Sequence, residues 1–164
     1  MDLLQIVHLQ KNQKGSMETK HKVILTGYEN DDIDSFVKKL QKNHVKFLID
    51  VRELPISRKK DFSKRGLSAR AQDKKIEYVH YRVLGSPREI RNKLRNNEMS
   101  YADFFINYRK HILENKEALL QIADMLKEKD VCLMCYEEET ELCHRSILVD
   151  ELQKMVPNLQ VQSI

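Results

Sequence analysis

Short apolar runs alternate along this chain with stretches in which apolar residues recur at helical spacing, and this alternation limits the folds open to it. The apolar runs at residues 23–26, 45–51 and 131–136 are too short for core helices and predict buried β-strands. Between the first two runs, apolar residues recur at i, i+3, i+4 and i+7 from Ile33 to Leu40, which predicts an amphipathic helix. A strand, a helix and a strand in this order form a βαβ unit, whose two strands pair in parallel.

The rest of the chain continues the same alternation of elements. We expect a loop and short helix at 62–75, a strand at 76–81, helices at 88–95, 101–113 and 118–126, a helix after Cys143 and a last strand at 159–164. This order predicts an α/β fold: an open, mostly parallel sheet with helices on both faces, as in a Rossmann-like three-layer sandwich. We assign residues 20–164 to this single domain and residues 1–19 to a flexible or loosely attached N-terminal extension.

Composition and charge narrow the class of protein without naming its function. At 164 residues the chain is long enough for one domain with its own core, and its formal net charge of +4 permits anionic partners without requiring them. All three cysteines lie near one predicted strand, which does not resemble the disulfide framework of a secreted protein. No apolar run approaches the ~18 residues of a membrane span. We therefore expect a cytoplasmic protein without a membrane segment, and we leave its oligomeric state open.

The stretch from Val131 to Asp150 holds more reactive side chains than any other part of the chain. Its strand gives way near Glu137 to an acidic loop, and Cys143, His144 and Arg145 then lead into the next helix. Proteins with α/β folds build ligand sites at the carboxyl ends of their strands. We therefore expect the functional site at this junction.

Several short motifs are similar, in order along the chain, to those of an uncharacterised bacterial and archaeal family, the domain of unknown function 488, in its Gly-Tyr-Glu type. They are Gly27-Tyr28-Glu29, Asp50-Val51-Arg52 followed by Pro55, Ser57 and Arg58, the pair Phe62-Ser63, Tyr78 and His80, Leu84-Gly85, and Leu133 to Glu137 leading to Cys143 to Ser146. The chain departs from the family pattern at Asn30, where another glycine is usual. The resemblance implies an α/β fold with a shared site, but it supplies no reaction, because a fold does not define a function.

Arginines from three separate segments are expected to meet at the crevice. Arg52 follows the second predicted strand, Arg58 lies in the next loop, and Arg145 comes from the cysteine-rich junction. Converging guanidinium groups bind phosphate or carboxylate through paired N–H donors. The alternative is that Asp50 pairs with an arginine and the group only holds loops together. We expect three further residues to contact the substrate, namely Tyr28, His80 and Cys135.

Three residues are candidates for catalysis, namely Asp50, Glu137 and Cys143. A carboxylate in a partly dry crevice can act as a general acid or base, which suits Glu137 with Asp50 as its partner. Cys143 begins a helix, whose dipole stabilises a nucleophilic thiolate. The alternatives for Cys143 are a buried small residue and a metal ligand.

Zinc binding is the explanation of the cysteines that the sequence favours least. Cys135, Cys143, His144 and His80 are ligand types that zinc accepts. However, the spacing Cys-x7-Cys-His lacks the paired Cys-x2-Cys that marks zinc sites. We therefore expect no metal site, and the sequence identifies no cofactor.

Two classes of function fit these residues. The first is an enzyme that acts on a nucleotide-like or other phosphorylated substrate, with the arginines binding its anionic group. The alternative is a non-catalytic module that binds nucleotides or nucleic acid through the same arginines and the basic segment at 58–75. A protein-interaction domain with a purely structural polar crevice is a third reading.

Overall fold

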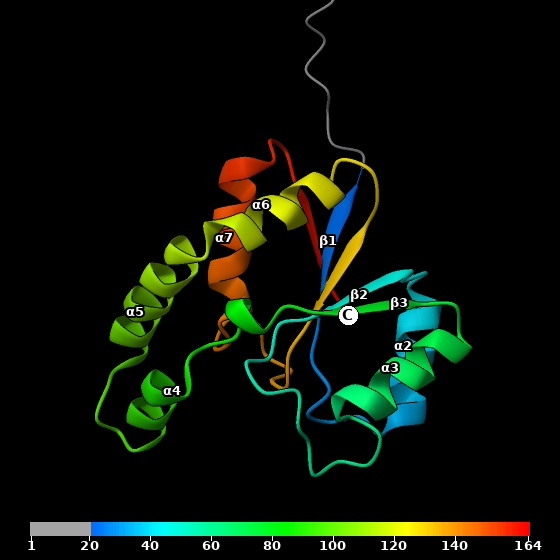
Figure 1. Cartoon of the computed structure of the whole chain (residues 1–164), viewed down its shortest axis with the longest axis horizontal. Coiled ribbons are helices and arrows are strands. Elements are labelled where there is room, and N and C mark those ends of the chain that lie inside the picture. The colour runs from blue at the N-terminus through cyan, green and yellow to red at the C-terminus, as the bar shows by residue number, and fades with distance from the viewer. Residues whose placement is uncertain (1–20) are drawn as a thin grey trace, which may run out of the picture.

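Five parallel strands form a single sheet at the centre of the structure, a computed structural model that describes residues 21–164 (Figure 1). The strand order is β3–β2–β4–β1–β5, and every pair of neighbours is parallel. This architecture confirms the α/β fold with a parallel sheet predicted from the sequence. The expected extension at residues 1–19 lies outside the described residues.

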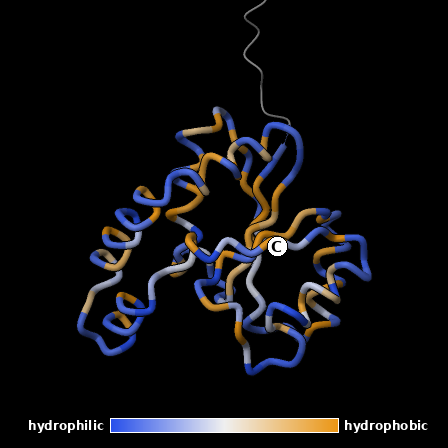
Figure 2. Tube along the Cα trace, viewed as in Figure 1, coloured by the Kyte–Doolittle hydropathy of each residue, from blue (hydrophilic) through white to orange (hydrophobic). Residues whose placement is uncertain are grey.

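The strands are short, and all five overlap the segments predicted from the sequence. They are β1 at Lys22–Thr26, β2 at Phe47–Asp50, β3 at Glu77–His80, β4 at Val131–Met134 and β5 at Gln160–Ser163. Every residue of β2 and β4 is buried, because helices cover both faces of the middle of the sheet. The strands therefore form the apolar centre of the molecule, while the helices turn polar faces outward (Figure 2).

Helices cover both faces of the sheet. They are α2 at Ile33–Lys42, α3 at Lys64–Asp73, α4 at Arg88–Arg95, α5 at Tyr101–Glu114, α6 at Lys116–Met125 and α7 at Arg145–Met155, with a short 3-10 helix, η1, at Arg82–Leu84. Figure 1 shows α2 and α3 on one face of the sheet and α6 and α7 on the other. Two apolar clusters result, since alternate strand residues such as Ile24 and Leu25 point to opposite faces. Within residues 21–164, no helix is long and apolar enough to cross a membrane.

The position of β4 in the sheet creates a crevice. This strand lies between β1 and β2, whose ends lead to α2 and α3 on one face, whereas the end of β4 leads to α7 on the other face. Where neighbouring parallel strands connect to opposite faces, their loops separate and leave a space outside the carboxyl ends. The residues that follow β1, β2 and β4 therefore surround one crevice.

Gly85 allows two loops at this crevice to pack closely, which generates a stability prediction. A Cβ at Gly85 would lie 2.0 Å from the backbone nitrogen of Glu53, whereas a Cβ at Gly66 would come no closer than 2.9 Å to its nearest atom. We expect Gly85→Ala to destabilise the protein by about 1–3 kcal/mol or more, because backbone atoms would have to move. Urea unfolding measures the effect. Gly66→Ala is the control, and an equal or larger loss of stability in that variant would contradict the prediction.

Candidate functional site

Two adjoining pockets occupy the crevice, and they share Ser86, Arg91, Arg95, Glu137 and His144. We call the smaller one, about 650 Å³, the basic pocket. The larger one, about 990 Å³, is the wide pocket. Because they share five lining residues, the two pockets form a continuous hollow large enough for a small-molecule ligand.

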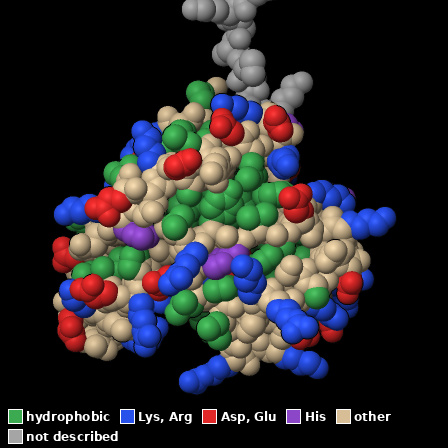
Figure 3. Space-filling view, in the orientation of Figure 1, with side chains coloured by type: hydrophobic (Ala, Val, Ile, Leu, Met, Phe, Trp, Pro, Cys, Tyr) green, Lys and Arg blue, Asp and Glu red, His purple; other side chains and the backbone are tan. Residues whose placement is uncertain are grey.

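Arginines line the basic pocket, and three of them have no protein partner among the residues that the structure describes. Among residues 21–164, the exposed guanidinium groups of Arg58, Arg88 and Arg95 form no hydrogen bond or ion pair. Arg91, by contrast, pairs with Glu53 at 2.9 Å. Figure 3 shows several Lys and Arg side chains along the lower edge of the molecule in this view. The free guanidinium groups give the basic pocket a strong preference for anions.

Helix α4 supplies most of the arginines that line the basic pocket, and the sequence analysis did not include them among the site residues. Arg88, Arg91 and Arg95 recur at i, i+3 and i+7, so they share one face of the helix, and that face lines the hollow. This spacing was a readable signal in the sequence. It was overlooked because nothing in the sequence alone indicated that the basic face of α4 turns toward the crevice.

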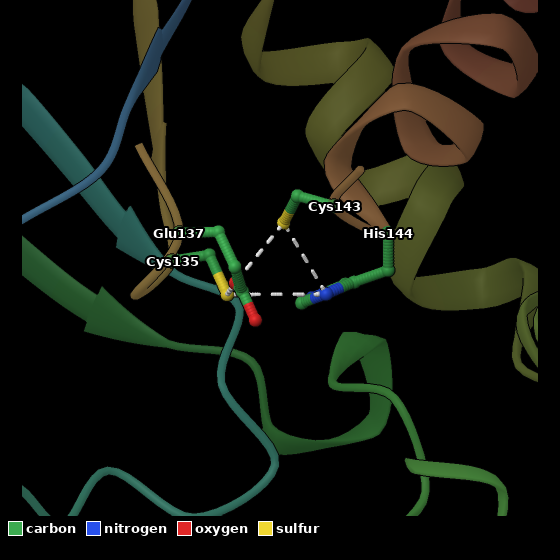
Figure 4. A group of neighbouring side chains, drawn as sticks. All are labelled: Cys135, Glu137, Cys143 and His144. Atoms are coloured by element: carbon green, nitrogen blue, oxygen red, sulfur yellow. Dashed lines mark hydrogen bonds between the residues drawn. The ribbon is translucent and has the colours of Figure 1, made fainter. Parts of the chain in front are cut away.

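Two thiols, an imidazole and a carboxylate meet at the floor of the hollow (Figure 4). Cys135 and Glu137 come just after β4, and Cys143 and His144 come just before α7. Cys135 Sγ and Cys143 Sγ lie 3.0 and 3.4 Å from the same oxygen, Glu137 Oε2. His144 Nδ1 lies 3.9 Å from Cys135 Sγ and 3.6 Å from Cys143 Sγ. We call these four residues the thiol cluster.

A backbone carbonyl at the end of β2 fixes the orientation of His144. The Nε2–H of His144 donates to the carbonyl oxygen of Val51 at 3.0 Å, and the edge of the ring packs against Tyr108. The hydrogen bond assigns the proton to Nε2, which leaves Nδ1 facing the two thiols. The imidazole therefore presents Nδ1 to the centre of the thiol cluster.

The charges within the cluster oppose the effect of burial. Burial alone would raise the pKa of Cys143, but the neighbouring Cys135 thiol, His144 and Arg145 hold this pKa well below its ordinary value. The hydrogen bond with Cys143, together with burial, raises the pKa of Cys135 well above its ordinary value. Burial and Cys143 also raise the pKa of Glu137, whereas His144 has a raised pKa because Cys143 outweighs burial. The surroundings therefore favour the charged form of Cys143 and disfavour the charged forms of Cys135 and Glu137.

A model of a protein family, described as domain of unknown function DUF488, matches residues 32–152. The chain belongs to the DUF488 family. The match covers well over half of the chain and includes β2, α4 and the whole thiol cluster. No curated protein and no solved structure matches the chain.

Arg145 of this DUF488 protein lies behind the thiol cluster and lines neither pocket. Its side chain is completely buried, its Nε–H donates to Cys143 Sγ at 3.3 Å, and Nη2 contacts the carbonyl of Glu137. Within the described part of the chain, Nη1 has no hydrogen-bond partner and no carboxylate pairs with Arg145. The sequence predicted that Arg145 binds substrate in the crevice, but its position instead makes it a buried counter-ion for Cys143.

Asp50 and Arg52 form a buried ion pair below the basic pocket. Asp50 is fully buried and accepts from Arg52 Nε at 2.8 Å, from Arg52 Nη2 at 2.6 Å and from the Tyr78 hydroxyl at 2.6 Å. Arg52 Nη1 donates to the hydroxyl of Tyr28 at 2.7 Å. Burial and Asp50 raise the pKa of Tyr78, so its hydroxyl stays a donor. These contacts match the sequence alternative in which the pair holds loops together.

The hollow thus collects some of the residues predicted for the site in this DUF488 protein and leaves others outside. Tyr28, Arg52, Arg58, Cys135 and Glu137 line the basic pocket, and Glu137 and Cys143 line the wide pocket. Asp50 and Arg145 line neither. His80 lies in a separate shallow pocket, where its Nε2 bonds the carbonyl of Arg52 at 2.7 Å.

Replacing Asp50 tests whether the ion pair is structural. We expect Asp50→Asn to lower the free energy of unfolding by about 3–5 kcal/mol, because Arg52 would be left as an uncompensated buried charge. Asp34, which pairs with Arg70 on the surface, provides the control, and Asp34→Asn should cost less than about 1 kcal/mol. Chemical denaturation of both variants makes the comparison. Equal stabilities would rule out the structural role.

Proposed function

We propose that this DUF488 protein is an enzyme that acts on a phosphorylated, nucleotide-like substrate bound in the hollow. The observation that carries the proposal is the set of free guanidinium groups of Arg58, Arg88 and Arg95 beside the thiol cluster. Exposed cations without protein partners are available to bind a phosphate, and Arg is the residue best suited to bind it through paired donors. The reactive side chains lie where the rest of such a substrate would be held.

The two pockets differ in a way that fits the two halves of a nucleotide. The basic pocket combines the free arginines with Arg52 and would hold the phosphate. The wide pocket carries Asn30, Glu139, Tyr101 and Phe104, among others, and is therefore both polar and aromatic. Aromatic faces stack with flat rings, and polar groups bond their edges, so the wide pocket suits a base or sugar.

Glu137 is our candidate for proton transfer. It lines both pockets, is only half-buried, and its raised pKa follows from burial and from Cys143. A carboxyl group with a raised pKa that faces a pocket can act as a general acid or base. The nucleophilic role of Cys143 stays a prediction, since its side chain is only 1% exposed. Asp50 has no place in this scheme, because its oxygens are occupied by Arg52 and Tyr78.

One observation weighs against the nucleic-acid alternative. The basic segment at 58–75 was expected to contact a backbone of phosphates, but Lys59 Nζ is held by the carbonyls of Tyr28 and Glu29, at 2.9 and 2.6 Å. This lysine closes the loop after β1 and is not free for a partner. Lys60, Lys64, Arg65, Lys74 and Lys75 of the same segment are exposed, so the case for a small ligand rests on Arg58, Arg88 and Arg95, which line a hollow of small-molecule size.

Binding of phosphorylated compounds tests the proposal directly. Nucleoside phosphates, sugar phosphates and inorganic phosphate are screened by thermal shift, where a ligand at ~100 times its Kd adds about 2.7 kcal/mol of stability. We expect Arg88→Ala and Arg95→Ala each to weaken binding about 10-fold or more, because a hydrogen bond to a charged group contributes about 1.5–3 kcal/mol. Arg82→Ala is the matched control, since Arg82 is exposed and lines neither pocket.

The proposal fails if no phosphorylated compound stabilises the protein. It also fails if the Arg88→Ala and Arg95→Ala variants bind the stabilising compound as tightly as the parent protein does. Binding of oligonucleotides alone, with affinity that falls steeply as salt rises, would point instead to the nucleic-acid alternative.

Glu137→Gln separates catalysis from binding. For the compound that binds, we expect turnover by this variant to fall by at least ~100-fold, because a positioned acid or base contributes ~10²–10⁴ to the rate. The ligand-induced thermal shift should persist, since the arginines remain. Product formation is followed by chromatography. Unchanged turnover would remove Glu137 from the mechanism, and no turnover by the parent protein would favour a binding module.

A further inference from the structure

We propose that the thiol cluster binds one zinc ion, with Cys135, Glu137, Cys143 and His144 as its ligands. Each of these side chains offers one ligand atom, and the four atoms lie within 4.8 Å of one another. Figure 4 shows the four side chains converging from the end of β4 and the start of α7. The inference concerns the floor of the hollow and deepens the proposed function, on which its role in substrate binding rests.

The spacing of the ligand atoms fits a tetrahedral zinc site. Zinc binds sulfur at about 2.3 Å and nitrogen or oxygen at about 2.0–2.1 Å, so tetrahedral geometry separates a sulfur from a nitrogen or oxygen ligand by about 3.5 Å. In the structure, the sulfur–nitrogen distances are 3.6 and 3.9 Å, and the sulfur–oxygen distances are 3.0 and 3.4 Å. An ion at the centre therefore needs only small side-chain shifts. Two thiolates, an imidazole and a carboxylate are also ligands that zinc accepts.

His144 is held as metal-binding histidines usually are. One ring nitrogen donates to the backbone carbonyl of Val51, and the other faces the two sulfurs. A carbonyl that fixes the far nitrogen of a ligand histidine is a common outer partner at metal sites, because it sets the tautomer and the ring orientation. The Val51 carbonyl thus prepares Nδ1 to bind a cation.

The charge of the surroundings also fits. Two thiolates and one carboxylate around Zn²⁺ leave a net charge of about −1 on the site, since imidazole is neutral. Arg145 lies beside the cluster, fully buried, and within residues 21–164 it pairs with no carboxylate. A buried cation requires a compensating charge. A zinc site with two thiolates would supply that charge permanently, whereas neutral thiols would not.

The four ligands differ in their access to the hollow. Cys135, Cys143 and His144 are at most 5% exposed, whereas Glu137 is half-buried and lines both pockets. Three buried ligands and one that faces a pocket resemble a catalytic zinc site, in which the fourth position exchanges with water or substrate. We place the phosphorylated substrate at this fourth position, where it would displace the Glu137 carboxylate from the zinc ion. Bound zinc would then polarise an oxygen of the substrate, and the released Glu137 would be available for the proton transfer proposed above.

This inference departs from the expectation of no metal that the cysteine spacing gave. Zinc motifs are recognised by paired cysteines, but here the first pair of ligands is Cys135 and Glu137, which are separated by one residue just after β4. A glutamate in an acidic run does not stand out as a ligand. Only the fold shows that Glu137 turns toward the cysteines while the run continues past it.

The metal content of the full chain tests the proposal. The protein is purified in reducing buffer without chelator, and we expect about one zinc ion per chain by elemental analysis. Metal-free protein titrated with zinc against a coloured chelator then gives the Kd. We expect Cys135→Ser to weaken zinc binding by more than the ~10–100-fold that follows from loss of an outer partner at a metal site. Cys132→Ala should keep its zinc, because Cys132 lies outside the cluster.

A second measurement covers the case in which a variant fails to fold. Cobalt added to the metal-free parent protein should give the intense charge-transfer absorption of a metal bound to thiolates, and zinc should displace it. The inference is overturned if the parent protein holds no zinc and gives no such absorption, or if folded Cys135→Ser binds zinc as tightly as the parent.

The zinc test is independent of the proposed function. If phosphorylated ligands bind but the protein binds no zinc, the proposed function is retained and only the metal site is rejected. If zinc binds in the cluster but no phosphorylated compound binds in the hollow, the metal site stands and the proposed function fails.

Discussion

The buried ion pair of Asp50 and Arg52 connects the loops from which the site is built. Arg52 reaches from the end of β2 to the hydroxyl of Tyr28 after β1 and to the carbonyl of Phe62 before α3. Tyr78 adds a bond from β3 to the same carboxylate. The charges are costly to bury, and only their complete set of partners makes the arrangement stable. This pair, rather than the apolar core alone, fixes where the loops around the hollow lie.

The same strand end also sets the geometry of the thiol cluster. Val51, between the two charged residues of the pair, presents its carbonyl to His144. On the other side, Gly27 lets the loop after β1 pack against the backbone of Glu137, where a Cβ would lie 2.1 Å from the carbonyl oxygen. The reactive side chains therefore rest on backbone supplied by β1, β2 and β4. Such support restricts their motion, as chemistry at a fixed centre requires.

Local patterns were enough to predict the fold but not the directions of the charged side chains. The strands and amphipathic helices follow from apolar spacing, which records burial directly, as the runs at β2 and β4 illustrate. Arg145 and Arg88 look equivalent in the sequence, yet one is buried behind Cys143 and the other is exposed in the basic pocket. That difference depends on which way each helix faces, and so on tertiary packing. The same limit hid the approach of Glu137 to both cysteines.

The burial of Arg145 beside Cys143 has a consequence for the history of the family. No carboxylate in the described part of the chain pairs with this guanidinium, so its counter-charge comes from the sulfur next to it. Replacing the cysteine by an uncharged residue would leave the cation stranded, and replacing the arginine would remove the group that stabilises the thiolate. Replacing either residue alone should therefore destabilise the protein or the thiolate. In lineages where the site has decayed, Cys143 and Arg145 should therefore have changed together.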